Sequence, residues 1–183
     1  MIQELFIMGA PGNVGSTLVK QIFEEGDTNT ELHPNPTRVV GLASSSNFVY
    51  SPGGFSEQDA RRFIGRDITG AKSYSDLWEL VEAADIGVRS PNSLIFVDVT
   101  PAGEKMTQFH LDILKNTSYG IVTANKNPVA SSDYETFQLL TANPRRYGYR
   151  CSVMAGADAV PFLRDAIDLN DRIHRIEGCL SGT

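Results

Sequence analysis

The sequence predicts an α/β fold: a doubly wound, mostly parallel sheet with helices on both faces. Apolar runs typical of buried strands alternate with helical patterns along the chain, the order that parallel sheets produce. A glycine-rich turn follows the first strand directly, as in nucleotide-binding α/β proteins. Composition agrees, because 183 residues with 41% hydrophobic and 21% charged residues are ordinary for a globular protein.

The strands are expected where short apolar runs stop at a glycine or a polar residue. The first run ends at Gly9, and the most strand-like run ends just before Thr100. In chain order, the predicted strands are residues 5–8, 38–43, 94–99, 120–123, 147–153 and 173–180.

The helices are expected between these strands, where apolar residues recur at helical spacing. Gly26 offers a stop for the first helix, and Ser132 with Glu135 fits the S-x-x-E capping box that opens the fourth. Residues 27–37 and 44–56 are rich in turn formers and polar residues, and we expect loops there. In chain order, the predicted helices are residues 13–25, 75–84, 104–115, 132–142 and 158–169.

The charge balance excludes some partners. Lys and Arg number 16 against 22 Asp and Glu, which leaves a net charge of −6. Nucleic-acid binding needs a concentrated basic face, so we expect no nucleic-acid partner. No apolar run is long enough for a membrane span, and the first eight residues carry no basic n-region. We therefore expect no membrane partner and a cytoplasmic location.

The cysteines and histidines give no metal-ligand pattern. Cys151 and Cys179 stand alone and far apart, so we expect two reduced thiols. His33, His110 and His174 belong to different predicted elements, which fits surface or packed side chains. We expect no metal site.

Glycines punctuate the turn between the first strand and the first helix. Gly9, Gly12 and Gly15 complete a G-x-x-G-x-x-G spacing, whereas Ala10 replaces the first glycine of the G-x-G-x-x-G template. Gly12 suits close approach of a pyrophosphate to backbone N–H groups, and Gly15 suits tight helix–strand packing. We favour dinucleotide binding over a tight turn without a ligand. The expected cofactor contacts are Gly9, Ala10, Gly12, Asn13 and Val14.

The end of the second strand bears on the choice of cofactor. An acidic residue there would bond a ribose 2′-hydroxyl, and a basic one would pair with a 2′-phosphate. The chain has neither, but Ser44 and Ser45 could bond a 2′-phosphate through their hydroxyls. We expect NADP or NAD as the cofactor and favour NADP, with a plain polar loop as the alternative.

Three further segments resemble one family. They are V-D-V-T at 97–100, T-A-N-K at 123–126 and G-C-L-S-G-T at 178–183. With the glycine turn, and supported by S-S-D-Y at 131–134 and by Ala155-Gly156, they resemble homoserine dehydrogenases over nearly the whole chain.

The resemblance implies an activity and a domain plan. Homoserine dehydrogenases interconvert L-aspartate 4-semialdehyde and L-homoserine by hydride transfer with NAD(P)H, on the way to threonine and methionine. Their N-terminal domain is Rossmann-like, and a second domain supplies most substrate and dimer contacts. Residues 1–155 would then be the cofactor domain. Residues 156–183 would begin the substrate domain, whose missing remainder would form a homodimer.

The resemblance also implies roles at the strand ends. Thr100 would lie near the cofactor ribose and nicotinamide, Asn125 and Lys126 between cofactor and substrate, and Gly182 and Thr183 at homoserine. Reduction of an aldehyde builds negative charge on its oxygen, which the Lys126 ammonium could stabilise as a catalytic residue. Without the resemblance, a solvated surface lysine is the simpler interpretation. For Asp98 we expect a turn or capping role.

Several positions depart from the family pattern. Arg150 stands where a glutamate is usual, Met154 replaces a glycine and Asp158 replaces a proline. The family binds a sodium ion at this loop, and a guanidinium is a poor neighbour for a cation, so we expect no sodium site. Pro101 replaces a common serine, and Ala10 replaces a glycine.

Family members continue well past the S-G-T segment. We therefore expect a fragment of a longer enzyme, with fusion to an aspartokinase left open, and no turnover by the 183 residues alone. Two alternatives stand beside this one. The chain could be a non-catalytic nucleotide-binding or regulatory module derived from the family. It could also be another G-x-x-G-x-x-G reductase, such as aspartate-semialdehyde dehydrogenase or dihydrodipicolinate reductase. The former needs a nucleophilic cysteine, for which Cys151 is an unconvincing candidate.

Overall fold

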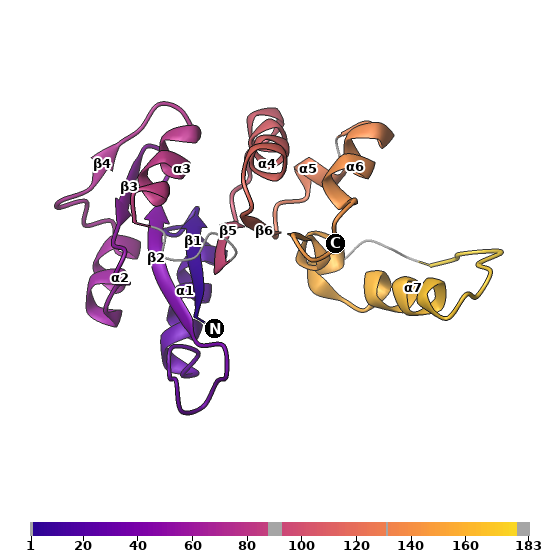
Figure 1. Cartoon of the computed structure of the whole chain (residues 1–183), viewed down its shortest axis with the longest axis horizontal. Coiled ribbons are helices and arrows are strands. Elements are labelled where there is room, and N and C mark those ends of the chain that lie inside the picture. The colour runs from indigo at the N-terminus through magenta and orange to yellow at the C-terminus, as the bar shows by residue number, and fades with distance from the viewer. Residues whose placement is uncertain (1, 88–92, 131, 179–183) are drawn as a thin grey trace.

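A computed structural model of the chain describes residues 2–87, 93–130 and 132–178. Within these residues, seven strands form one sheet in the order β4-β3-β2-β1-β5-β6-β7 (Figure 1). The five strands from β2 to β7 in that order run parallel, while β3 and β4 add antiparallel pairs at one edge. The bounds are β1 Gln3–Met8, β2 Thr37–Ala43, β3 Asn47–Tyr50, β4 Lys72–Ser73, β5 Leu94–Asp98, β6 Gly120–Thr123 and β7 Tyr147–Gly148.

Helices cover both faces of the sheet, as predicted. The helices described are α1 Asn13–Glu24, α2 Glu57–Ile64, α3 Trp78–Asp85, α4 Glu104–Asn116, α5 Asn127–Ala130, α6 Tyr134–Thr141 and α7 Ala159–Asp168. Among them, none combines the length and the apolar character needed to cross a bilayer.

The central strand β1 explains the two layers. Its successive side chains point to opposite faces, so Leu5 and Ile7 pack with α1 and α2, while Phe6 and Met8 pack with α3, α4 and α6. All four are buried, as a parallel strand with helices on both sides requires. Figure 1 shows these two sets of helices on opposite sides of the sheet.

One contact between neighbouring strands needs a glycine. Gly41 of β2 lies beside Phe6 of β1, and a Cβ on Gly41 would come within 2.2 Å of the Phe6 ring. The space left by the missing side chain holds that ring, which stacks on Phe96 at a centroid distance of 5.2 Å. The large aromatic core therefore depends on the small residue next to it.

The order of the strands positions the site. The chain leaves β1 for β2 on one side and later places β5 on the other side of β1. In open α/β sheets, ligands bind at the carboxyl ends of the strands where the order reverses in this way. The glycine turn after β1, Ser44 after β2, Thr100 after β5 and Asn125 after β6 all lie at this edge.

The prediction of a plain loop at 44–56 was wrong, and α2 and β4 were missed. Residues 47–50 form β3, because Phe48 is buried against the core and anchors an otherwise polar strand. Helix α2 is mostly polar, with only Ala60 and Phe63 buried, so its helical pattern is weak. Strand β4 has two residues, too few for any periodic signal.

The second half holds two further corrections. The strand predicted at 147–153 ends at Gly148 and gives way to 3-10 turns at Arg150–Ser152 (η2) and Met154–Gly156 (η3). Met154 and Ala155 have φ of 48° and 52°, which an extended strand does not allow. Residues 173–178 of the last predicted strand form no strand, and residues 179–180 lie outside the described part.

The capping box predicted at Ser132 was also wrong. Helix α6 begins at Tyr134, and its N-cap is Asp133, whose Oδ1 accepts a hydrogen bond from the Thr136 N–H at 2.8 Å. Asp133 takes the role because the helix starts one residue later than the pattern suggested. The Ser132 hydroxyl is buried and has no hydrogen-bond partner among the described residues.

Candidate functional site at the strand ends

The turn after β1 is fixed to the end of β2. The N–H groups of Gly9 and Ala10 both donate to the carbonyl of Ala43, at 2.9 and 3.0 Å. Gly12 then donates to the Gly9 carbonyl at 2.9 Å, which folds the chain back toward α1. Gly9 has φ of 84°, a left-handed conformation that favours glycine.

Packing requires a glycine most clearly at Gly15, and both packing and the left-handed backbone favour one at Gly9. A Cβ on Gly15 would lie 2.4 Å from the Gly9 carbonyl oxygen, and one on Gly9 would lie 3.1 Å from the Val99 carbonyl oxygen. Without these side chains, α1 and the loop after β5 can both approach the turn. Gly12 differs, because its Cβ would meet only the Gly9 oxygen, at 3.1 Å.

The start of α1 is open. Gly12 is the N-cap and supplies no side chain, so none caps the first-turn N–H groups. Gly12, Asn13 and Val14 are all exposed, and Val14 keeps 57% of its surface accessible. Uncapped N–H groups with the positive end of a helix dipole form a ready site for phosphate oxygens. This is the property that a dinucleotide pyrophosphate requires.

The serine segment forms the turn between β2 and β3. The Ser44 hydroxyl donates to the Asn47 carbonyl at 3.1 Å and accepts from the Asn47 N–H at 3.0 Å. Ser44 is therefore engaged within the turn, whereas Ser45 is exposed. Strand β4 brings the exposed Lys72 opposite Phe48, next to this turn. The sequence reasoning missed Lys72 as a candidate because it did not predict β4.

A buried carboxylate joins the next two strand ends. Asp98, the last residue of β5, is fully buried, and its Oδ1 accepts from the Thr100 N–H at 2.9 Å and from Thr100 Oγ1 at 2.7 Å. Its Oδ2 accepts from Asn125 Nδ2 at 3.0 Å. The turn role expected for Asp98 is confirmed. The same carboxylate holds Thr100 and Asn125 together.

The side chain of Asn125 is fixed by the protein. Its Nδ2 also donates to the Ala102 carbonyl at 2.7 Å, and its Oδ1 accepts from the Asn127 N–H at 3.1 Å. Asn127 Nδ2 in turn donates to the Pro101 carbonyl at 3.0 Å. The segment that begins at Asn125 is thereby tied to the loop after β5.

Lys126 lies at the same edge and differs from Asn125 in exposure. It is exposed, and its ammonium has no hydrogen bond or ion pair within the described part of the chain. Its carbonyl accepts from the Ala130 N–H at 2.8 Å at the start of α5. Gly182 and Thr183, the expected substrate contacts, lie outside the described residues.

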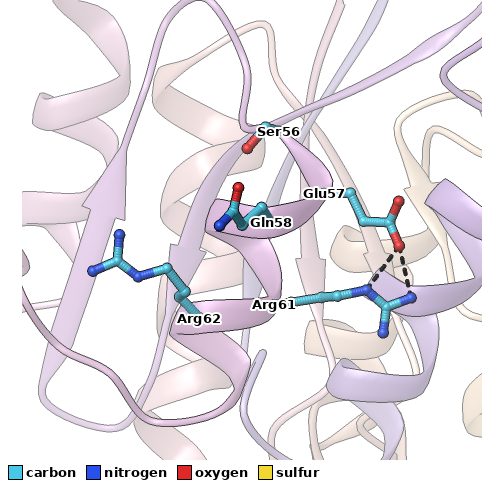
Figure 2. Close-up of a pocket in the computed structure, with 5 residues that line it drawn as sticks. All are labelled: Ser56, Glu57, Gln58, Arg61 and Arg62. Carbon is cyan, nitrogen blue, oxygen red and sulfur yellow. Dashed lines mark hydrogen bonds and ion pairs between the residues drawn. The ribbon is translucent and has the colours of Figure 1, made fainter.

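Two hollows lie near the strand ends or away from them. One of about 640 Å³ borders Asn127, between α4 and α6. The other, of about 660 Å³, runs along α2 (Figure 2). Its two arginines are already paired: Arg61 with Glu57 and Glu24 at 2.7 Å each, and Arg62 with Asp67 at 3.0 Å. The residues that line it include none from the strand ends.

Arg150, in the loop where we expected no sodium site, is already paired within the protein. Arg150 Nη2 pairs with Asp158 Oδ1 at 2.7 Å, and Arg150 Nε donates to the Gly156 carbonyl at 3.4 Å. A guanidinium therefore contacts the carbonyl and carboxylate oxygens that a cation would need. In the described part of the chain, no group of three His, Cys, Asp or Glu side chains is placed to hold a metal.

Comparisons with known proteins show which proteins the chain resembles. No protein-family profile matches the chain. The bifunctional aspartokinase/homoserine dehydrogenase 2, chloroplastic, of Zea mays is 27% identical over 176 residues, covering 94% of this chain and 18% of that protein. The homoserine dehydrogenase of Paracoccidioides brasiliensis (strain Pb18) is 29% identical over 158 residues, covering 82% of this chain and 42% of that protein.

A solved structure gives the same fold. A hyperthermophilic archaeal homoserine dehydrogenase in complex with NADPH superimposes with a TM-score of 0.67 at 24% identity, covering 90% of this chain and 49% of that one. The predicted α/β, Rossmann-like fold is confirmed. The chain spans less than half the length of each of these three proteins.

Proposed function

We propose that the chain is the NAD(P)-binding part of a homoserine dehydrogenase, since its homologues over most of its length are homoserine dehydrogenases. The observation that carries the proposal is the uncapped, glycine-lined start of α1 at the strand ends, with Thr100 next to the glycine turn. Among the known proteins named above, one with this fold binds NADPH.

Each part of the site has a role in this proposal. The first N–H groups of α1 hold the pyrophosphate, and the turn of Gly9, Ala10 and Gly12, whose own N–H groups bond within the protein, lets it approach closely. The bound cofactor supplies the hydride. Thr100 borders the ribose and nicotinamide, and Lys126 places its ammonium where the aldehyde oxygen of L-aspartate 4-semialdehyde gains negative charge on the way to L-homoserine.

The complete enzyme would extend beyond this chain. Residues 1–155 form the cofactor domain in this proposal, and residues 156–183 begin the substrate domain that carries Gly182 and Thr183. The rest of that domain completes the substrate pocket and a homodimer, in the cytoplasm, for threonine and methionine synthesis. Light scattering of the longer gene product checks the dimer, and cell fractionation checks the location.

The glycine turn gives the first test. The Gly12→Asp variant keeps a good helix N-cap and a folded chain but places a carboxylate against the pyrophosphate. We expect NADPH affinity, measured by calorimetry, to fall by more than about tenfold, because like charges in contact are costly. Gly53→Asp is the matched control, since a Cβ there meets nothing within 4 Å. If wild-type protein binds neither NADPH nor NADH, the proposal is wrong and the non-catalytic alternative gains.

The choice between NADP and NAD gives the second test. We propose that NADP is preferred and that Lys72, which lies opposite Phe48 just after the serine turn, pairs with the 2′-phosphate. The Lys72→Gln variant should weaken NADPH binding about three- to fivefold, the size of an exposed ion pair, and leave NADH binding unchanged. An equal loss for both cofactors would contradict this pairing.

A further inference from the structure

Behind the candidate site lies a buried polar chain that the proposed function does not use. His110 of α4 and Asp98 of β5 are both fully buried, and His110 Nε2 lies 3.3 Å from Asp98 Oδ2. On its other side, His110 Nδ1 lies 3.0 Å from the hydroxyl of Tyr147 in β7. Side chains from β7, α4 and β5 thus form a continuous series of contacts, and its last member, Asp98, bonds Thr100 and Asn125.

The Asp98 carboxylate has few charged neighbours. Its hydrogen-bond donors are Thr100, Asn125 and, at 3.4 Å, the Thr123 hydroxyl of β6. Among the described residues, no lysine or arginine lies within ion-pair distance of it. His110 is therefore the titratable group that faces Asp98 from the helix layer. A buried carboxylate depends strongly on each remaining donor.

The hydroxyl of Tyr147 indicates which nitrogen of His110 carries the proton. Burial raises the pKa of Tyr147, and the charge of Asp98 raises it further, so the phenol keeps its hydrogen. We infer that this hydrogen is donated to His110 Nδ1, which is then the acceptor. With Nδ1 as the acceptor, the hydrogen of a neutral ring is on Nε2, which lies 3.3 Å from Asp98 Oδ2 and has no hydrogen-bond partner of good geometry among the described residues.

This arrangement determines whether the site donates or accepts hydrogen bonds toward a ligand. The hydroxyl hydrogen of Thr100 and both amide hydrogens of Asn125 are used by Asp98 and by the Ala102 carbonyl. Toward a ligand, Thr100 Oγ1 can therefore only accept. An acceptor suits the ribose hydroxyls or the carboxamide NH₂ of a nicotinamide nucleotide, both of which can donate.

We propose that His110 is a positioning residue for the cofactor site: its buried Nε2, otherwise without a partner among the described residues and 3.3 Å from Asp98 Oδ2, donates to that carboxylate and holds it in the orientation that presents Thr100 as an acceptor to the nicotinamide half of the cofactor. The inference rests on the proposed function and adds a residue that lies outside the strand-end loops. His110 itself touches no ligand and acts through Asp98.

Calorimetric titration of the whole chain with NADPH tests the link. His110→Leu removes the donor at similar volume, and we expect the Kd to rise about tenfold, the value of one hydrogen bond to a charged group. His110→Gln keeps an N–H near the Nε2 position and should restore the Kd to within about threefold. Tyr119→Phe removes another hydroxyl of the same core cluster and should leave the Kd unchanged.

A double-mutant cycle separates positioning from general damage. In a Thr100→Val background, His110→Leu should change the Kd by less than about twofold, because the group that it positions is absent. Equal effects of His110→Leu in both backgrounds would overturn the inference, as would failure of His110→Gln to rescue. If the His110 and Thr100 variants do not change the Kd as expected, while wild-type protein binds NADPH and Gly12→Asp does not, the role of His110 is wrong and the proposed function is retained. If wild-type protein binds no cofactor, both proposals fall.

One measurement does not depend on the cofactor. Nitrogen-15 NMR of histidine-labelled protein reports which ring nitrogen carries the hydrogen in neutral histidine. We expect the Nε2–H tautomer for His110, assigned by its loss in His110→Gln. An Nδ1–H tautomer would contradict the donor role toward Asp98.

Discussion

At the scale of single residues, Gly41 shows how one missing side chain supports an aromatic core. The Phe6 ring fills the position that a Cβ on Gly41 would need, and the ring is fully buried. Replacing Gly41 with alanine forces either the ring or strand β2 to move. Overpacking of this kind is costly in a dense interior.

We expect Gly41→Ala to lower the free energy of unfolding by roughly 1–3 kcal/mol. Urea denaturation followed by fluorescence or circular dichroism measures it. Gly53→Ala serves as the control, because its Cβ would meet open space. An unchanged midpoint for Gly41→Ala would mean that the core yields at Phe6 without loss.

The residue scale also shows where sequence reasoning stops. The glycine turn was recognisable, because Gly9, Gly12 and Gly15 follow a strand and open a helix within a few positions of each other. The link between Asp98 and His110 was not recognisable. Its members come from separate elements, and their distance depends on how α4 packs under β5.

At the scale of elements, the start of α6 tests which residue caps a helix. Asp133 accepts from the Thr136 N–H, and this bond lowers the pKa of Asp133 below its ordinary value. A depressed pKa means that the folded state favours the charged form. The stabilisation is therefore present above the ordinary aspartate pKa and is lost as the pH falls through the lowered value.

Asp133→Ala should lower the melting temperature at neutral pH, and its difference from wild type should shrink as the solution becomes acidic. Thermal melts at several pH values give this comparison. Ser132→Ala should leave the melting temperature unchanged at every pH, because its hydroxyl makes no hydrogen bond within the described residues. A larger loss of melting temperature in Ser132→Ala than in Asp133→Ala would show that Ser132 is the helix cap after all.

Elements also differ in how far the sequence predicts them. Strand β5 and helix α4 were predicted within one residue of their observed ends, because their apolar patterns are long and regular. Helix α2 was not, since it is mostly polar and is fixed instead by its Ser56 cap and by Phe63. The bend after Gly148 depends on left-handed backbone at Met154 and Ala155. Neither residue type predicts that conformation.

At the scale of the whole molecule, the buried core is confined to the sheet and its helices. Among the described residues, every buried apolar side chain lies between Leu5 and Tyr147. The side chains of α7 whose burial is described, at 160–168, contribute none, and Figure 1 shows the helix beyond the end of the sheet. Phe162 and Leu169 keep 72% and 76% of their surface exposed.

Local stability should follow this division. Amide hydrogens of α7 should exchange within a small fraction of the time that β1 and β5 need, because their opening disrupts few buried contacts. Hydrogen exchange with mass spectrometry resolves the three segments in one experiment. Protection of α7 equal to that of β1 would show that the helix is packed as firmly as the core. It would also argue against a domain boundary near residue 155.

The two outer strands of the sheet have a further consequence. Strands β4 and β7 are each two residues long, and β4 carries the charged Lys72. Free strand edges are the places where one protein can template pairing with another and start aggregation. Outer strands this short offer another polypeptide few residues to pair with, so we expect little aggregation through β4 or β7 at high concentration.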